Sequence, residues 1–443
     1  MSAFDKIIGY KQVKHELAQI ADTLKNGEAY KALGVSSPRG LLLYGVPGVG
    51  KSLMAQCLIE ESGRQAFACR KTEPDGKFVD TIRKTFESAE AAAPSIVYLD
   101  DMDKFANDDK FHRNSEGYVT VQSCIDELSG KEVFVLATVN EMHCLPDSLT
   151  RAGRFDRVIK VDVPEGDDAV EIIDHYLKGK RIASNLDAKA IADIIEGRSC
   201  ATLETVINEA GLIAGYKRKE CVTMEEVVKA CLGVVFRADG AAADVGTIDV
   251  TRPGNDSRVA WHEAGHVVVN EVVRPGSVAL ASARWRSSCC GGFVHTTRSE
   301  DIDPVVSMQE RLAGALGGRA AVDLEFGIVD AGAQNDLRQA FSLAQHLYCD
   351  LCYGGFSMYE DESDEQKRCV EVATTALVEN FYRKAKEALC KNREFLEKIV
   401  VALAERDVLL ASDIAAIKES CHIVEMTLQD VHFRFIYING SES

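Results

Sequence analysis

The sequence predicts an α/β nucleotide-binding module followed by a mainly α-helical domain. Over residues 1–165, short apolar runs alternate with longer amphipathic segments that have helical spacing. Strands that alternate with helices form a parallel sheet with helices on both faces, and nearly continuous apolar runs suit strands that are buried on both sides. Four runs are predicted as strands: GLLLYG (40–45), SIVYLDD (95–101), VFVLATVN (133–140) and RVIKVDVP (157–164).

Changes in this pattern divide the rest of the chain. The strand signal is lost after the first module, and residues 166–235 carry helical spacing throughout. Small residues, Gly and Asp then dominate residues 236–256, which predicts an exposed linker. Residues 257–420 are predicted to be mainly helical with one short strand near GGFVHT (291–296), and the tail 421–443 contains HFRFIYI, which alternates like a strand.

Composition sets limits on the function. The chain has 443 residues, of which 46% are hydrophobic and 27% charged, as in globular proteins of several domains. Its net charge of −18 disfavours a broad nucleic-acid surface. No apolar stretch approaches the ~20 residues of a membrane span, and the N-terminus lacks the pattern of a signal peptide. We therefore expect a soluble, cytoplasmic protein whose 14 cysteines are mostly reduced.

A phosphate-binding loop follows the first predicted strand. GVPGVGKS matches G-x-x-x-x-G-K-[ST] and lies between a strand and a helix, the context that this motif requires. Lys51 is expected to contact the β- and γ-phosphates, and Ser52 the Mg²⁺ ion. The expected nucleotide-binding residues are Gly45, Val46, Pro47, Gly48, Val49, Gly50, Lys51, Ser52 and Leu53.

Two acidic residues end the second predicted strand. SIVYLDDMD places Asp100 at the carboxyl end of a strand in the same sheet as the phosphate-binding loop. An acid at this place holds the Mg²⁺ of a nucleotide, and Asp101 beside it could polarise the attacking water. A surface acidic turn is the alternative interpretation.

A metal-binding motif begins the second half of the chain. HEAGH matches H-E-x-x-H, and on a helix His262 and His266 face the same side one turn apart, so both can bind one Zn²⁺. Glu263 is suited to act as a general base. A catalytic zinc usually has a third protein ligand. Spacing alone leaves this ligand open among His295, Glu325, Asp330, Asp336 and His346.

The first module resembles a AAA+ ATPase. The resemblance rests on the order of four motifs: the phosphate-binding loop, the acidic strand end, ATVN and RAGRFDR. It implies that Asn140 orients the attacking water and that Arg151 and Arg154 enter the site of a neighbouring subunit. It also implies that residues 166–235 are the helical lid. Three positions depart from the family pattern, namely Asp101, where Glu is usual, and Cys200 and Thr202 at the start of a lid helix.

The second half resembles the peptidase domain of the FtsH family. HEAGH is followed by LGGRAAVDLEFG (316–327) and AGAQNDL (331–337) in the order that this family has. The resemblance implies that Asp336 is the third zinc ligand. It also matches CCGGFVHTT to a strand whose edge could hold an unfolded polypeptide. Val322 departs from the family, which more often has Glu there.

Together the two resemblances cover residues 4–420 and imply one activity. The FtsH family implies an ATP-driven hexameric ring that pulls polypeptides into a zinc proteolytic chamber, with Zn²⁺, ATP and Mg²⁺ as cofactors. The family is normally anchored by N-terminal membrane helices, whereas this sequence begins at the ATPase module, so we expect a soluble branch or a truncated chain. A shortened pore loop offers Phe78 as the aromatic that grips substrate, with a core phenylalanine as the alternative. Val322 and this loop leave a second hypothesis, a remodelling chaperone with weak or no peptidase activity.

Overall fold

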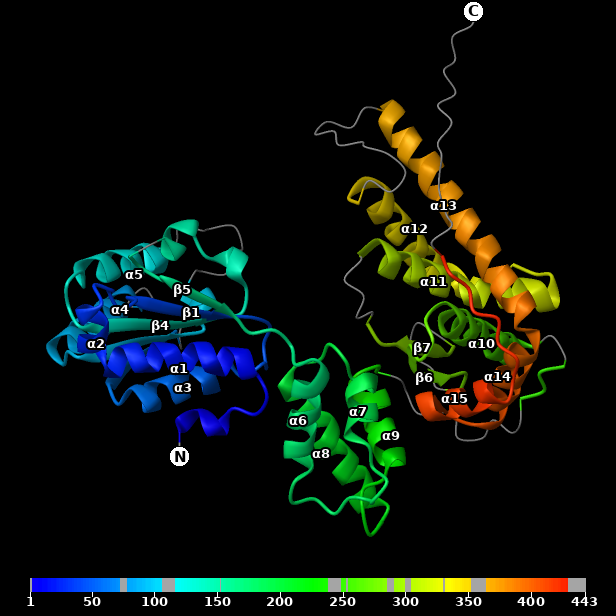
Figure 1. Ribbon diagram of the computed structural model, residues 1–443, viewed down its shortest axis with the longest axis horizontal. Coiled ribbons are helices and arrows are strands. Elements are labelled where there is room, and N and C mark those ends of the chain that lie inside the picture. The colour runs from blue at the N-terminus through cyan, green and yellow to red at the C-terminus, as the bar shows by residue number, and fades with distance from the viewer. Residues whose placement is uncertain are drawn as a thin grey trace, which may run out of the picture. The chain divides into compact units, whose positions relative to one another are not determined.

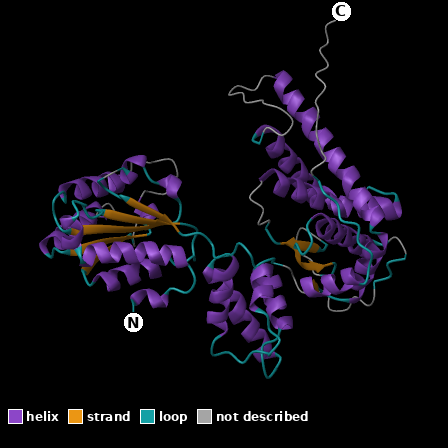
Figure 2. Ribbon diagram, viewed as in Figure 1, coloured by secondary structure: helices purple, strands orange, loops and turns teal. Residues whose placement is uncertain are grey.

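The computed structural model describes most of the chain as two compact units. The units are Met1–Val227 and Val228–Ser443, and the division falls within helix α9 (Met224–Val234). The described residues are 2–71, 78–105, 116–151, 153–237, 248–251, 254–284, 291–298, 304–329, 331–351 and 364–428. The strand expected at HFRFIYI and most of the expected linker lie outside them. Figures 1 and 2 show the elements of each unit.

The first unit contains a parallel five-stranded sheet in the order β2-β3-β4-β1-β5, which confirms the predicted α/β class. The central strands β3 and β4 are apolar and buried almost throughout, because helices cover both faces. Strand β2 has only one buried residue and was not predicted. The strands are β1 (Gly40–Tyr44), β2 (Gln65–Arg70), β3 (Ser95–Asp100), β4 (Val133–Val139) and β5 (Arg157–Lys160).

Two pairs of helices cover the sheet. Figure 1 shows α1 and α3 on one side and α4 and α5 on the other. A separate group of helices, α6 to α8, follows β5, as the helical spacing predicted. The helices are α1 (Lys11–Lys25), α2 (Gly27–Ala32), α3 (Lys51–Ser62), α4 (Phe78–Ala91), α5 (Glu116–Glu127), α6 (Gly166–Leu177), α7 (Ala188–Ile194) and α8 (Cys200–Tyr216). Short 3₁₀ turns are η1 (Ala3–Lys6), η2 (Met102–Phe105), η3 (Met142–Cys144) and η4 (Asp147–Thr150).

Phe78 is a core residue, so the second of its two interpretations holds and the substrate-gripping one does not. It begins α4, is only 8% exposed, and packs edge-on against Phe105 with ring centroids 4.7 Å apart. Burying a phenylalanine ring stabilises a fold by roughly 1.5–3 kcal/mol. The packing of α4 on η2 therefore accounts for this residue.

The second unit is mainly helical and is built around α10. Thirteen positions of α10 are buried. Where α10 crosses α11, a Cβ built on Gly265 would lie 2.3 Å from the Gly317 carbonyl oxygen, so only glycine permits this approach. The helices are α10 (Asn255–Val273), α11 (Pro304–Phe326), α12 (Gln334–Cys349), α13 (Asp364–Lys391), α14 (Arg393–Glu405) and α15 (Ala411–Glu419), and η5 (Ala331–Ala333) precedes α12.

This unit also holds a small antiparallel sheet in the order β7-β6-β8. One strand was predicted here, and β7 (Phe293–Thr296) is that strand. Strands β6 (Val278–Ser282) and the two-residue β8 (Leu409–Leu410) were not predicted. Every residue of β6 is buried, so the strand lacks the alternation that reveals a half-exposed strand. Among the described helices, none has the length and apolarity that crossing a bilayer requires.

Candidate active sites

The phosphate-binding loop wraps around the side chain of Lys51. Lys51 begins α3, is 6% exposed, and donates hydrogen bonds to the Gly45 and Val46 carbonyl oxygens at 2.7 and 3.0 Å. A third bond joins its Nζ atom to Oδ1 of Asn140 at 2.9 Å. Burial lowers the pKa of Lys51, while the charges of Asp101, Asp103 and Asp100 act to raise it. The loop thus holds a partly desolvated ammonium group at the N-terminus of a helix, where phosphate oxygens bind favourably.

The acids at the end of β3 lie beside this loop. Oδ1 of Asp100 accepts hydrogen bonds from Tyr98 at 2.7 Å and Thr138 at 3.0 Å, and lies 3.5 Å from Oγ of Ser52. The predicted Mg²⁺ residues Ser52 and Asp100 are therefore neighbours. Carboxylate and hydroxyl oxygens are the ligands that Mg²⁺ prefers, so the residues present fit this ion.

Asp101 has a constrained backbone and a cationic neighbour. Its φ angle is 50°, a left-handed value that Asp tolerates better than most residues. Its backbone N–H donates to Oγ1 of Thr138 at 3.0 Å, and Nζ of Lys104 lies 2.7 Å from its carboxylate. Burial acts to raise the pKa of Asp101, but the hydrogen bond from Lys104 and nearby positive charge outweigh it and lower the pKa. Asp101 is therefore ionised at neutral pH.

Asn140 is held between the phosphate-binding loop and a third acid, Asp103. Its backbone N–H donates to Oδ1 of Asp103 at 3.1 Å, and its side-chain amide lies 3.3 Å from Oδ2 of Asp103. Its own Oδ1 accepts the bond from Lys51. Asp103 belongs to the run SIVYLDDMD but was not predicted to have a role.

The two arginines of RAGRFDR differ in their surroundings. Arg151 is exposed. Arg154 is 21% exposed and forms a bidentate ion pair with Asp126 of α5, with nitrogen–oxygen distances of 3.0 and 2.8 Å. It also donates to the Ser148 carbonyl oxygen at 2.6 Å. Arg154 therefore has a structural partner within its own chain.

The helical group touches the phosphate-binding loop directly. The Ala201 N–H donates to the Gly48 carbonyl oxygen at 3.0 Å. Beside it, Sγ of Cys200 lies 3.3 Å from the hydroxyl oxygen of Tyr10, and burial raises the pKa of the Cys200 thiol. Thr202 bonds Ser199 at the start of α8, with 3.2 Å between the hydroxyl oxygens. Tyr10, Cys200 and Ala201 line a cleft of about 660 Å³ that includes the loop from Pro47 to Met54.

The second unit brings His262, His266 and Asp336 together. The Nε2 atoms of the two histidines are 3.0 Å apart, and Oδ2 of Asp336 lies 3.1 Å from His262 and 3.6 Å from His266. Two residues come from α10 and one from the first turn of α12. Of the other spacing candidates, Glu325 pairs with Arg393, His346 pairs with Asp350, His295 packs against Phe236, and Asp330 lies outside the described residues.

This arrangement fits a tetrahedral zinc ion. Nitrogen and oxygen ligands about 2.0 Å from such an ion stand about 3.3 Å from one another, close to the three distances found here. A Cβ built on Gly318 of α11 would lie 2.5 Å from Nε2 of His266 and 2.6 Å from Nε2 of His262. Gly318, which has no side chain, therefore leaves free space next to both nitrogen ligand atoms.

Neighbouring groups orient the triad. Nδ1 of His266 donates to the Gly314 carbonyl oxygen at 2.8 Å, which leaves Nε2 as the nitrogen that can bind a metal. Asn270 holds the next turn of α10 through the His266 carbonyl oxygen. Burial acts to raise the pKa of Asp336, but hydrogen bonds from His262 and His266 lower it well below its usual range. Asp336 is thus a carboxylate, as a metal ligand must be.

Glu263 lies in the same cleft, which has a volume of about 590 Å³. The residue is 6% exposed, and a Cβ built on Gly292 would lie 2.8 Å from its Oε1 atom. Gly292 directly precedes β7, so the Glu263 carboxylate lies beside the start of this strand. Val322, where the family more often has Glu, lies on α11 and is fully buried in the hydrophobic core of the second unit.

Sequence reasoning missed several residues that shape both sites. Thr138 and Asp103 support the acids and Asn140, while Gly318 and Gly314 shape the metal position. Signals for two of them were present: Asp103 is the third acid of its run, and Gly318 belongs to LGGRAAVDLEFG. Nothing local marks Thr138, because its contacts come from strand pairing.

Family models match both halves of the chain. The model of the ATPase family associated with various cellular activities (AAA) matches residues 41–163, and that of peptidase family M41 matches residues 249–417. The chain is 33% identical to ATP-dependent zinc metalloprotease FtsH 2 of Symbiobacterium thermophilum, over 94% of this chain and 74% of that protein. It is 29% identical to FtsH of Mycoplasma pneumoniae, over 94% and 62%, and 28% identical to FtsH 1 of Methylacidiphilum infernorum, over 94% and 70%.

A AAA ATPase module joined to an M41 peptidase domain defines the class of ATP-dependent zinc metalloproteases. The chain belongs to the FtsH family of these enzymes. Its cofactors are accordingly Zn²⁺, ATP and Mg²⁺.

Proposed function

We propose that this protein unfolds polypeptides with the energy of ATP, translocates them and hydrolyses them at the zinc centre. The observation that carries the proposal is the convergence of His262, His266 and Asp336 beside Glu263. In this proposal His262, His266 and Asp336 hold the zinc ion and Glu263 is the general base.

The chemistry at this centre divides between the metal and the chain. Zinc supplies Lewis-acid polarisation of the scissile carbonyl group. Glu263 accepts a proton from the attacking water and passes it to the leaving amine. Strand β7 supports substrate binding, because it lies at the edge of the described sheet with β6 on one side only. An extended polypeptide could add to this edge through main-chain hydrogen bonds.

At the nucleotide site, the proposal gives each group one task. Lys51 binds the β- and γ-phosphates, Ser52 and Asp100 hold Mg²⁺, and Asp101 and Asn140 orient the attacking water. The remaining contacts to nucleotide come from the loop residues Gly45, Val46, Pro47, Gly48, Val49, Gly50 and Leu53.

Arg151 and Arg154 act in the site of a neighbouring subunit in this proposal, which requires an oligomer, and we propose a homohexameric ring. We place the protein in the cytoplasm, where its many cysteines stay reduced. The proposed parts are a large ATPase subdomain (1–165), a lid (166–235), a linker (236–256), a peptidase domain (257–420) and a C-terminal extension (421–443).

A single substitution tests the proposal. Glu263→Gln keeps the size of the side chain but removes the base, so ATP-dependent degradation of unfolded casein should fall by about 10²–10⁴-fold. Zinc content and ATP turnover should stay at the level of the parent protein. Equal casein degradation by the variant would refute the proposal.

A second function is favoured by the apolar Val322, which stands where the family more often has Glu. It is a remodelling chaperone that unfolds proteins but cleaves them weakly or not at all. Casein cleavage with ATP, measured with zinc and then with a chelator, separates the two functions. Unfolding of a substrate without chelator-sensitive cleavage at any zinc level would support the chaperone.

A further inference from the structure

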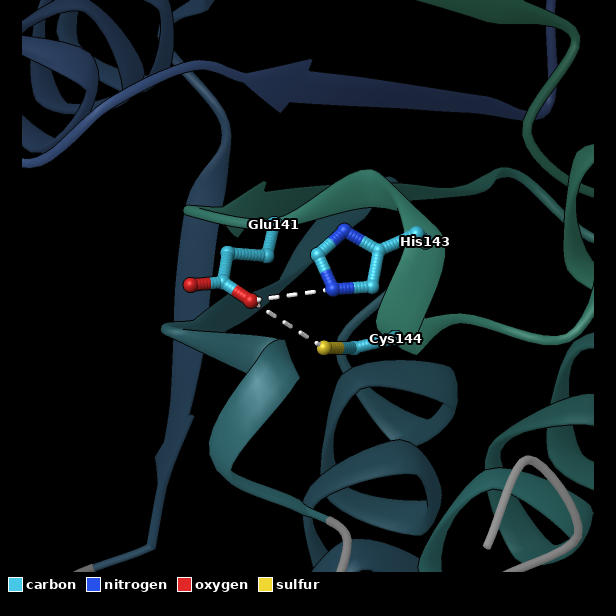
Figure 3. Close-up of side chains that lie close together, drawn as sticks. All are labelled: Glu141, His143 and Cys144. Atoms are coloured by element: carbon cyan, nitrogen blue, oxygen red, sulfur yellow. Dashed lines mark hydrogen bonds and ion pairs between the residues drawn. The ribbon is translucent and has the colours of Figure 1, made fainter. Parts of the chain in front are cut away.

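A second group of metal-ligand side chains lies in the ATPase unit, on the segment that follows β4. Glu141, His143 and Cys144 place a carboxylate oxygen, an imidazole nitrogen and a thiol sulfur within 4.8 Å of one another. Figure 3 shows the three side chains pointing toward a common centre. No role in the ATPase or peptidase chemistry described above uses any of them.

The distances suit a tetrahedral ion. Oε2 of Glu141 lies 3.1 Å from Nε2 of His143 and 3.6 Å from Sγ of Cys144. Around zinc, with oxygen and nitrogen about 2.0 Å and sulfur about 2.3 Å away, such pairs stand about 3.3 and 3.5 Å apart. The two measured distances agree with these values, as do the 3.0, 3.1 and 3.6 Å at the peptidase triad, and the third pair, His143 and Cys144, lies within 4.8 Å.

The backbone of this segment is fixed at both ends. On one side β4 is buried along its whole length, and the Asn140 N–H is bonded to Asp103. On the other side Leu145 is 3% exposed and donates its N–H to the Met142 carbonyl oxygen. The intervening η3 turn sets the ligands at positions i, i+2 and i+3, so three donors are presented without a rearrangement of the fold.

The donor set selects the metal. Thiolate and imidazole together favour zinc over Mg²⁺ or Ca²⁺, which take oxygen ligands. The imidazole of His143 and the carboxylate of Glu141 are 74% and 62% exposed, so solvent can supply the fourth ligand. We propose that Glu141, His143 and Cys144 form a surface site for one Zn²⁺ ion, separate from the peptidase zinc and adjacent to Asn140.

Cobalt spectroscopy distinguishes the two sites in the full-length chain. Co²⁺ bound by a thiolate gives a near-ultraviolet charge-transfer band, whereas the peptidase site offers only two imidazoles and a carboxylate. With cysteines kept reduced, Co²⁺ should produce this band in the parent protein. Zn²⁺ should then bleach it, because zinc binds such sites more tightly than cobalt.

Variants locate the band. Cys144→Ser should abolish the charge-transfer band. His143→Gln should lower the Co²⁺ affinity measured by the band at least tenfold. Both variants should keep the ATP turnover of the parent protein. Cys221→Ser is the matched control, because Cys221 is also half-buried but lies outside the cluster, and it should keep the band. A band that survives in Cys144→Ser, or no band in the parent protein with excess Co²⁺, overturns the proposal.

Discussion

Arg154 and Asp126 form a bidentate ion pair within one chain, and the neighbouring Arg151 is exposed. This difference allows the effect of removing each arginine on stability to be separated from its effect on ATP turnover. Arg154→Ala should lower the free energy of unfolding by about 1 kcal/mol, because it deletes the pair and the bond to Ser148. Arg151→Ala should change it by less than about 0.5 kcal/mol. Urea denaturation of both variants measures this.

ATP turnover completes this test. If both arginines act in a neighbouring site, both alanine variants should lose about 10³-fold or more in turnover. Asp126→Asn weakens the internal pair but keeps Arg154, so it should cost stability without that loss. A loss of turnover in Asp126→Asn as large as in Arg154→Ala would show that Arg154 acts only through its own chain.

Replacing Gly318 should empty the peptidase centre. In Gly318→Ala the new Cβ would lie 2.5 Å from Nε2 of His266, inside the space that a zinc ion needs. We expect the zinc content of the peptidase site and casein cleavage to fall at least tenfold, with ATP turnover unchanged. Gly211→Ala is the control, since a Cβ there meets nothing within 4 Å. Normal zinc binding by Gly318→Ala would contradict the proposed metal position.

A buried ion pair ties α10 to α15. The carboxylate of Glu271 is 4% exposed and accepts bonds from Nζ of Lys418 at 3.0 Å and from the N–H groups of Gly276 and Val278. Lys418→Met leaves this charge buried without its cation, which should destabilise the second unit by about 3 kcal/mol. Calorimetry should show a lower transition for that unit alone. Lys398→Met removes the cation of an exposed pair with Glu394, so it should change the free energy of unfolding of that unit by less than about 0.5 kcal/mol.

The N-terminal segment should make the stability of the first unit depend on pH. Bonds from Lys25, Ala3 and Ser2 lower the pKa of Glu61 from 4.5 to about 2. Because the folded pKa is the lower one, the stabilisation is complete above pH 4.5 and is lost as the pH falls toward 2. Glu61→Gln should cost about 1 kcal/mol at pH 7, after allowance for solvent screening.

Denaturation curves at several pH values check this expectation. The difference between Glu61→Gln and the parent protein should shrink as the pH falls below 4.5. Glu28→Gln is the control, because Glu28 is 89% exposed and pairs only with Lys31 among the described ion pairs. A difference that stays constant across this range would contradict the expected pKa.

Local patterns were enough to predict much of the fold. The apolar runs at 40–45 and 95–101 predicted β1 and β3, since a strand buried on both faces has few polar residues. Strand β2 was not predicted, because five of its six residues are at least partly exposed and give no continuous apolar run. Strand β6 was not predicted because all its residues are buried. A short, mostly apolar run of this kind does not distinguish a strand from a helix.

The sites were predictable where spacing along the chain fixes geometry. His262 and His266 share a helix, so their separation of four residues determines that they meet. The pairing of Arg154 with Asp126 and of Asn140 with Asp103 depends on tertiary packing, so it could not be predicted from spacing along the chain. The burial of Phe78 likewise depends on Phe105, which lies 27 residues later in the sequence.

The contact between Gly265 and Gly317 has an evolutionary consequence. A Cβ on Gly317 would lie 2.5 Å from the Gly265 carbonyl oxygen, so a change to any other amino acid at either codon forces α10 and α11 apart. The zinc ligands His262 and His266 sit on one of these helices, whereas the ATPase motifs lie in the other unit. One nucleotide change at either codon would therefore disturb the helix that carries two zinc ligands while leaving every ATPase motif intact.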